Sequence, residues 1–305
     1  MNLPSPIQKL ASAFLDEHGI NLLVKRDDLI HPEISGNKWR KLKLWIEKFH
    51  QGKYDALLTF GGAYSNHIAA TAAMGALEKI PVIGVIRGDE LNQNANPTLQ
   101  NAAKNGMRLV FSSREEYDLK EEKYFQEELR RRYGNVLIIP EGGFGYYGML
   151  GCTEILSEIK DQVNAIFLPM GTGTTLAGVL FGSETETIYG VSALKGGDFL
   201  NKNVEFLLSQ AGLDKEDINE ETKRLQVLTD YHFGGYAKHT PELIEFMKDF
   251  KSVYKLNLDY IYTAKMMFGL FELIKANHFE KGTTILAIHT GGLQGNSSIE
   301  DLILM

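Results

Sequence analysis

The stretch Ala165-Ile166-Phe167-Leu168-Pro169-Met170-Gly171-Thr172-Gly173-Thr174-Thr175-Leu176-Ala177-Gly178 joins a short apolar run to a glycine- and threonine-rich turn. A six-residue apolar run bounded by such a turn predicts a buried β-strand, and the residues after the turn predict a helix. A strand, a glycine turn and a helix together form the repeating unit of parallel α/β sheets. This stretch therefore predicts an α/β fold.

Similar units recur on both sides of it. Strands are predicted at 56–60, 81–86, 108–111, 136–139, 187–193, 224–228 and 284–288, and helices at 65–77, 97–105, 117–133, 146–160, from 174, from 199, after 241 and at 263–276. Two series of βα units predict two open, doubly wound parallel-sheet domains. We expect residues 1–50 and 160–305 to form a large domain, with a small α/β domain at 51–159 inserted in it.

The composition is that of a globular protein of 305 residues, with 44% hydrophobic and 23% charged residues and a formal net charge of −7. The basic residues are scattered, so no nucleic-acid surface is expected. A single cysteine, Cys152, and the lack of an apolar leader or an 18-residue apolar run predict a cytoplasmic protein without membrane contact. The eight histidines show no metal-ligand spacing, so no metal site is predicted.

Lys38 stands in the motif Ser35-Gly36-Asn37-Lys38, which is followed by an apolar stripe with helical spacing. The stripe predicts a helix, with Ser35 or Asn37 as its N-cap and Lys38 on its first turn. There the helix dipole opposes the ammonium charge and lowers its pKa, which favours an amine that can form a Schiff base with an aldehyde. A solvated surface lysine is the alternative for this motif taken alone.

Two glycine turns between a strand and a helix predict anion sites, because a helix start presents unpaired backbone N–H groups. The turn at 171–175 suits a monophosphate; it contains neither a Walker A sequence nor the acidic residue of a dinucleotide site. The turn Gly61-Gly62-Ala63-Tyr64-Ser65-Asn66-His67 suits a carboxylate. Helix capping by Ser65 or Asn66 is the structural alternative. A third glycine-rich turn follows the last strand at 289–295.

Taken together, these motifs resemble the pyridoxal-phosphate enzymes of the 1-aminocyclopropane-1-carboxylate deaminase and D-cysteine desulfhydrase family. The likeness also covers Pro4 to Gln8, Val24 to Leu29 and the Tyr262-Thr263-Ala264-Lys265 segment, and it runs almost end to end. It implies the tryptophan synthase β-subunit-like fold (fold type II), pyridoxal 5'-phosphate bound by the large domain, and a homodimer.

The resemblance also implies roles for individual residues. Lys38 would form the Schiff base with the cofactor and shuttle the substrate proton, and Ser65 would meet the substrate carboxylate or act as nucleophile. Asn66 would face the cofactor's phenolic oxygen, and His67 would join Ser65 and Asn66 in binding substrate. The phosphate would be held by Gly171, Thr172, Gly173, Thr174 and Thr175, with help from Lys41. Tyr236 and Tyr262 would act close to the substrate.

Three positions indicate the branch of this family. Deaminases that open the cyclopropane ring are expected to have glutamate, leucine and glutamine where this chain has Thr263, Thr290 and His67. A threonine hydroxyl beside the cofactor's ring nitrogen would leave that ring largely neutral, which is sufficient for expelling a thiolate. The expected activity is therefore a lyase that removes the α-proton of a small amino acid and eliminates its β-substituent.

The substrate that we expect is D-cysteine, which would give pyruvate, ammonia and sulfide. One alternative is a 1-aminocyclopropane-1-carboxylate deaminase. Another, of a different class, is a noncatalytic phosphometabolite-binding protein, in which an amine at Lys38 would have no use.

Overall fold

The computed structural model describes residues 1–197 and 199–304, and it divides into two compact units. Unit 1 contains Met1–Asn37 and Cys152–Met305, and unit 2 contains Lys38–Gly151. The predicted α/β fold with two open, mainly parallel sheets is confirmed. The boundaries of unit 2 differ from the expected small domain at 51–159. The helix that carries Lys38 belongs to unit 2, and the residues from Cys152 onward belong to unit 1.

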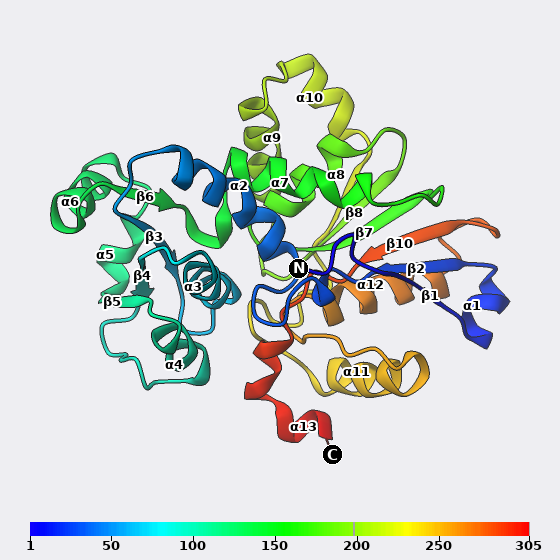
Figure 1. Cartoon of the computed structure of the whole chain (residues 1–305). Helices are drawn as coiled ribbons and strands as arrows, with labels where there is room; N and C mark the ends of the chain where they lie inside the picture. The colour runs from blue at the N-terminus through cyan, green and yellow to red at the C-terminus, as the bar shows by residue number, and fades with distance from the viewer. Residues whose placement is uncertain (198, 305) are drawn as a thin grey trace. The chain divides into compact units, whose positions relative to one another are not determined.

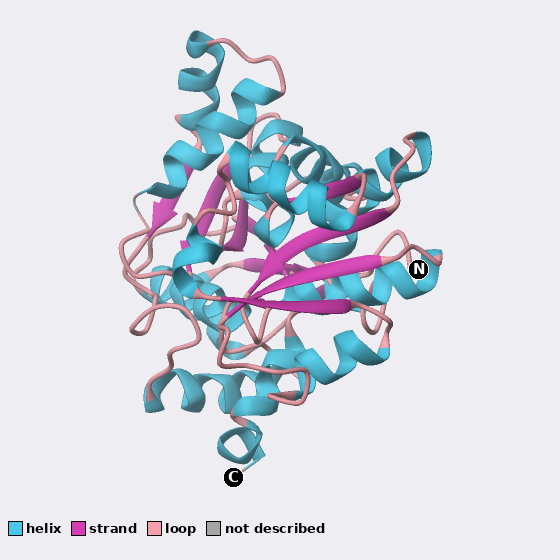
Figure 2. Cartoon of the chain, turned by 90° about the vertical axis from the view of Figure 1, so that its left-hand side faces the viewer, coloured by secondary structure: helices cyan, strands magenta, loops and turns pink. Residues whose placement is uncertain are grey.

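Unit 1 contains a six-stranded sheet in the order β1-β2-β10-β7-β8-β9, in which only the edge strand β1 is antiparallel to its neighbour. Its strands are β1 (Ile7–Leu10), β2 (Asn21–Lys25), β7 (Ala165–Met170), β8 (Thr187–Ser192), β9 (Leu225–Leu228) and β10 (Thr284–Ile288). Figure 2 shows these twisted strands between helices. Strands β1 and β2 were not predicted from the sequence; pairing with β10 stabilises β2, whose own apolar run is short.

The helices of unit 1 cover both faces of this sheet. They are α1 (Ala13–His18), α8 (Thr174–Gly182), α9 (Phe199–Gln210), α10 (Lys215–Thr222), α11 (Pro241–Tyr254), α12 (Thr263–Lys275) and α13 (Glu300–Leu304), with short 3-10 turns η1 (Asp27–Leu29) and η3 (Leu293–Ser298). Helices α11 and α12 pack apolar side chains on one face, and α8 and α9 lie over the other (Figure 1). Burial on both faces explains why β7 and β10 are apolar almost throughout.

Unit 2 is built on a four-stranded parallel sheet in the order β5-β4-β3-β6. Its elements are α2 (Asn37–Gln51), β3 (Ala56–Gly61), α3 (Asn66–Glu78), β4 (Val82–Arg87), α4 (Pro97–Lys104), β5 (Arg108–Ser112), α5 (Arg114–Asp118), α6 (Lys123–Tyr133), β6 (Val136–Ile139), η2 (Glu141–Gly143) and the first half of α7 (Tyr146–Ser157). Helices α5 and α6 pack on one face of the sheet and α3 on the other (Figure 1).

The single helix predicted at 117–133 is wrong, because the chain forms two helices there. Ser113 caps α5 by accepting a hydrogen bond from the Glu116 amide, which starts the first helix earlier than predicted. Glu122 then adopts an extended conformation, with φ −74° and ψ 129°, before α6 begins. The break falls in the charged stretch 120–123 (Lys-Glu-Glu-Lys), which offers no apolar side chain to pack on the sheet.

Within the described residues, no helix has the length and apolar character needed to cross a membrane.

Candidate active site

The turn at 171–175 connects β7 to α8 in unit 1. Gly173 is the N-cap of α8 with φ +84°, and no side chain among the described residues caps this helix start. The hydroxyls of Thr172 and Thr174 lie 2.9 Å apart, and Asn37 Nδ2 donates to Thr175 Oγ1 at 2.8 Å. The amide groups of the first helical turn and the adjacent hydroxyls form a cluster of hydrogen-bond donors, which fits a phosphate group.

Tyr262 lies against this turn. A β-carbon built on Gly171 would be 3.2 Å from the Tyr262 hydroxyl oxygen, so a larger residue at 171 would push against the phenol. The rings of Tyr236 and Tyr262 meet edge to face, with centroids 6.1 Å apart. The structure therefore brings three of the predicted site elements of unit 1 together: the glycine turn and both tyrosines.

The start of α12, which carries Tyr262 and Thr263, is organised by Asp259. Its side chain is fully buried, and Oδ2 accepts hydrogen bonds from the Ile261 and Tyr262 amides at 3.1 and 2.9 Å. Oδ1 accepts from the amide and the hydroxyl of Thr263 at 2.9 and 2.6 Å. Sequence analysis did not identify Asp259; an aspartate four residues before a helix-starting threonine was the available signal.

Lys265, in the first turn of α12, positions the loop that carries Tyr236. Its buried ammonium donates to the carbonyl oxygens of His232 and Gly235 at 2.9 and 2.7 Å. Burial lowers the pKa of Lys265 to about 8, although Asp259 acts in the opposite direction. Tyr236 itself is 44% exposed. The loop that carries Tyr236 is thus attached to α12 by two hydrogen bonds.

Thr290, two residues after the end of β10, lies against the segment before Lys38. The Asn37 amide donates to the Thr290 carbonyl at 3.2 Å, and a β-carbon on Gly36 would be only 1.8 Å from that oxygen. Gly36 also has φ +65°, so glycine is required there on both counts. Asn37 thereby contacts both Thr290 and Thr175, and Lys38 is the next residue along the chain.

In unit 2 the predicted turn at 61–67 joins β3 to α3. Ser65 is the N-cap, and its Oγ accepts from the Ile68 amide at 3.3 Å, so the capping explanation holds for this residue. Capping leaves the hydroxyl proton available to a ligand. The backbone of Gly61 comes close to Ser65, since a β-carbon at position 61 would lie 2.8 Å from Ser65 Oγ. Asn66 is the first residue of α3 and is half-buried.

His67 is buried beside the lysines of α2. Its Nε2 lies 2.8 Å from the hydroxyl of Thr59. Burial lowers the pKa of His67 well below its usual value, and the positive charges of Lys38 and Lys41 lower it further. The electrostatic influence of both lysines places them near this imidazole within unit 2. Lys38 is on the first turn of α2, as predicted.

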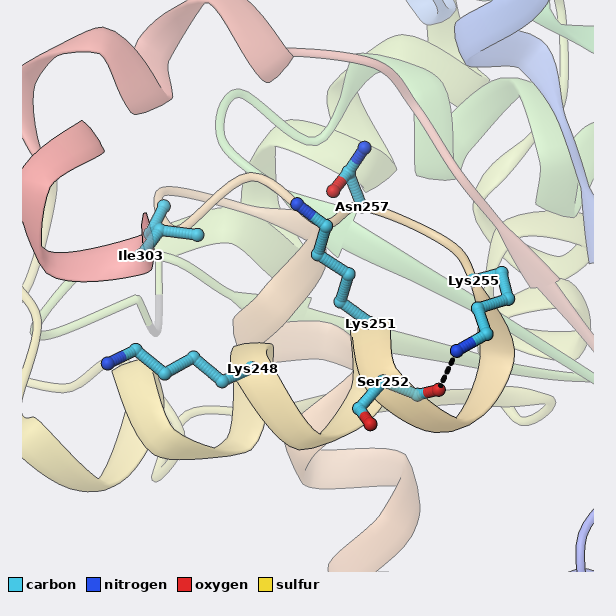
Figure 3. Close-up of a pocket in the computed structure, with 6 residues that line it drawn as sticks. All are labelled: Lys248, Lys251, Ser252, Lys255, Asn257 and Ile303. Atoms are coloured by element: carbon cyan, nitrogen blue, oxygen red, sulfur yellow. Dashed lines mark hydrogen bonds between the residues drawn. The ribbon is translucent and has the colours of Figure 1, made fainter. Parts of the chain in front are cut away.

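A surface hollow of about 480 Å³ is found elsewhere in unit 1 (Figure 3). It is lined by the end of α11, the segment after it and one residue of α13: Lys248, Lys251, Ser252, Lys255, Asn257 and Ile303. Lys255 Nζ donates to the Ser252 carbonyl at 2.7 Å. Among the described residues, none of those predicted for the active site lines this hollow.

The chain belongs to the family of pyridoxal-phosphate dependent enzymes, whose model matches residues 2–291. It is 34% identical to a Thermotoga maritima protein named "Putative 1-aminocyclopropane-1-carboxylate deaminase", over 96% of this chain and 95% of that protein. It is 30% identical to the Arabidopsis thaliana "Bifunctional D-cysteine desulfhydrase/1-aminocyclopropane-1-carboxylate deaminase, mitochondrial", over 96% of this chain and 77% of that protein.

A solved structure of a homologue of 1-aminocyclopropane-1-carboxylate deaminase superimposes with a TM-score of 0.82. Its sequence is 28% identical, and the match covers 99% of this chain and 94% of the other. Together these matches confirm the predicted family, its pyridoxal phosphate cofactor and its fold type, and they favour an enzyme over the noncatalytic alternative. The uncapped start of α8 and its threonine hydroxyls fit the phosphate of that cofactor.

Proposed function

We propose that this enzyme is a D-cysteine desulfhydrase-like lyase. The supporting observation is Thr263, whose fully buried hydroxyl donates to Asp259 Oδ1 at 2.6 Å and accepts from the Asp259 amide at 2.8 Å. The glutamate expected here in ring-opening deaminases would place a second carboxylate directly against a buried one, which is unfavourable. The local structure is thus built around threonine.

The proposed roles of the protein groups follow from their chemistry. The amide groups of residues 174–176 and the nearby hydroxyls would hold the cofactor's phosphate. Lys38 would bind the aldehyde carbon and later carry the proton removed from the substrate's Cα. Ser65, with a hydroxyl proton left free by its capping bond, would donate to the substrate carboxylate. Bound pyridoxal phosphate would supply the electron sink for the charge left at Cα.

Asn66 would face the cofactor, and Tyr236 and Tyr262 would line the substrate side. Lys38 would remove the Cα proton, and sulfur would leave with the electron pair of the Cβ–S bond. One water molecule would then replace the amino nitrogen of the product. The balanced reaction is D-cysteine plus water giving pyruvate, ammonia and hydrogen sulfide. Formation of a homodimer stays a prediction of this family assignment.

A substrate panel tests the proposal. Keto-acid release is measured with D-cysteine, L-cysteine, D-serine, β-chloro-D-alanine and 1-aminocyclopropane-1-carboxylate. We expect D-cysteine to react with the highest kcat/KM, together with release of sulfide. The names of the Thermotoga and Arabidopsis relatives both include 1-aminocyclopropane-1-carboxylate deaminase, so this cyclopropane compound is the second candidate substrate. Reaction of that compound alone would refute the desulfhydrase assignment and support the deaminase.

The role of Lys38 has a separate test. The Lys38→Ala variant should retain less than about 1% of the activity, and borohydride should attach the cofactor to a peptide containing residue 38 only in the wild type. Lys43, also on α2, offers a matched control: Lys43→Ala removes a lysine of the same helix and should keep the borohydride-trapped adduct. Trapping on another lysine would contradict the assignment.

A further inference from the structure

Thr59 and His67 form a buried hydrogen-bonded pair in unit 2. Thr59 lies on β3 and is fully buried, and its hydroxyl donates to the Ile139 carbonyl at 2.8 Å. A hydroxyl has only one proton, so toward His67 Nε2, 2.8 Å away, Thr59 Oγ1 can only accept. The network therefore favours the tautomer in which Nε2 carries the proton and donates it to Thr59.

The other ring nitrogen of His67 is then a bare acceptor. Burial and the charges of Lys38 and Lys41 keep the imidazole neutral, so Nδ1 has a lone pair and no proton. The side chain is 2% exposed, and within residues 1–197 and 199–304 its Nδ1 makes no hydrogen bond. A buried acceptor without a donor costs free energy in a protein interior, and a bound group that donates to it would remove that cost.

Neighbouring backbone keeps this ring in place. Gly143 has φ +73°, and a β-carbon on it would lie 3.6 Å from His67 Cε1 and 3.2 Å from Lys41 Cβ. The Cε1 atom joins the two ring nitrogens, so the η2 turn covers the edge between them. The orientation of Nδ1 is thus determined by Thr59 on one side and by the η2 turn beside it.

We propose that His67 Nδ1 reads the β-substituent of the substrate by accepting a hydrogen bond from its hydroxyl or thiol, with Thr59 as the positioning residue that holds the required tautomer. The inference rests on the proposed function, since it assigns the ligand of the same site. The ligand class is a small amino acid whose β-carbon bears an O–H or S–H group. Substrates without that donor would leave the acceptor unpaired and react less efficiently.

Two substrates of similar shape give the first test. D-serine has a β-hydroxyl donor and β-chloro-D-alanine has none. In His67→Leu, kcat/KM for D-serine should fall about tenfold more than kcat/KM for β-chloro-D-alanine, the usual effect of one lost neutral hydrogen bond. His67→Asn keeps an acceptor near the Nδ1 position and should recover part of that difference. Equal losses for both substrates in His67→Leu would overturn the proposal.

The second test follows the histidine itself. Two-bond ¹⁵N–¹H spectra of the holoenzyme should show a protonated Nε2 and a bare Nδ1 at neutral pH. Thr59→Ser keeps the hydroxyl and should preserve this pattern, whereas Thr59→Val removes the acceptor and should give a mixture of tautomers. A protonated Nδ1 in the wild type would refute the inference, whatever the activity.

The same spectra separate the inference from the proposed function. Adding D-serine should shift the Nδ1 resonance of the holoenzyme, and adding β-chloro-D-alanine should not. If no compound of the panel is turned over but D-serine shifts Nδ1, the proposed function fails and the acceptor role stands. If D-serine is turned over without a shift, the acceptor role fails and the proposed function stands.

Discussion

Replacement of Asp259 by alanine should loosen the start of α12, because this carboxylate satisfies four donors at once. They are the amides of Ile261, Tyr262 and Thr263 and the hydroxyl of Thr263, at 2.6 to 3.1 Å. The carboxylate is fully buried. Each unpaired buried donor costs about 1–3 kcal/mol, but the helix start can relax and recover part of this. We therefore expect a loss of about 3 kcal/mol in local opening free energy.

Hydrogen exchange measures that loss directly. About 3 kcal/mol corresponds to roughly a hundredfold faster exchange of the amides at 261–263, followed by mass spectrometry of a peptide that spans them. Asp259→Asn keeps one acceptor oxygen in nearly the same shape and should lie between the wild type and alanine. Since Tyr262 lies against the glycine turn, KM should rise along with the exchange rate.

Unit 2 provides an internal control, because both tryptophans of the chain, Trp39 and Trp45, belong to it. Their fluorescence unfolding curve should be unchanged in Asp259→Ala, which would show that the damage is local. An acceleration below tenfold at 261–263, or a shift of the tryptophan curve equal to the exchange effect, would refute this account of Asp259.

Three further predictions concern other residues. Because the pKa of His67 is lowered in the folded protein, the unfolded chain binds more protons than the folded chain below about pH 6.5. The free energy of unfolding of unit 2, measured by urea unfolding with tryptophan fluorescence, should therefore fall by up to about 1.4 kcal/mol per pH unit below that point. The His67→Asn variant should lack this fall. The pKa of Lys265 is about 8 in the folded protein, which is below its value in the unfolded chain. The free energy of unfolding, followed by far-UV circular dichroism, should therefore rise between about pH 8 and 10.5 in the wild type. In Lys265→Met it should change less over the same range. Gly173→Ala forces a left-handed conformation on alanine at the phosphate turn and should weaken pyridoxal phosphate binding about tenfold in an absorbance titration, whereas Gly106→Ala, with the same φ of +84° in unit 2, should not.

Much of the fold could be predicted from local sequence patterns. Strand β7 and the turn after it are recognisable because a buried parallel strand must be apolar and a phosphate turn needs glycine at a left-handed position. The break between α5 and α6 and the strand β2 could not be predicted in this way. Strand β2 depends on pairing with β10, which is distant in the sequence, and the helix break depends on the extended dihedral angles of Glu122. The spacing of apolar residues indicates neither feature.

The order of motifs along the chain was enough to determine the family, its cofactor and the lysine on the first turn of α2, because those features depend on residue types at set spacings. Only the tertiary structure revealed how Asp259 and Lys265 hold the two tyrosine segments, and that the Thr59 hydroxyl lies 2.8 Å from His67 Nε2. These are hydrogen bonds between groups on different elements or buried within a turn. Their existence depends on packing in three dimensions, which no linear pattern of residues records.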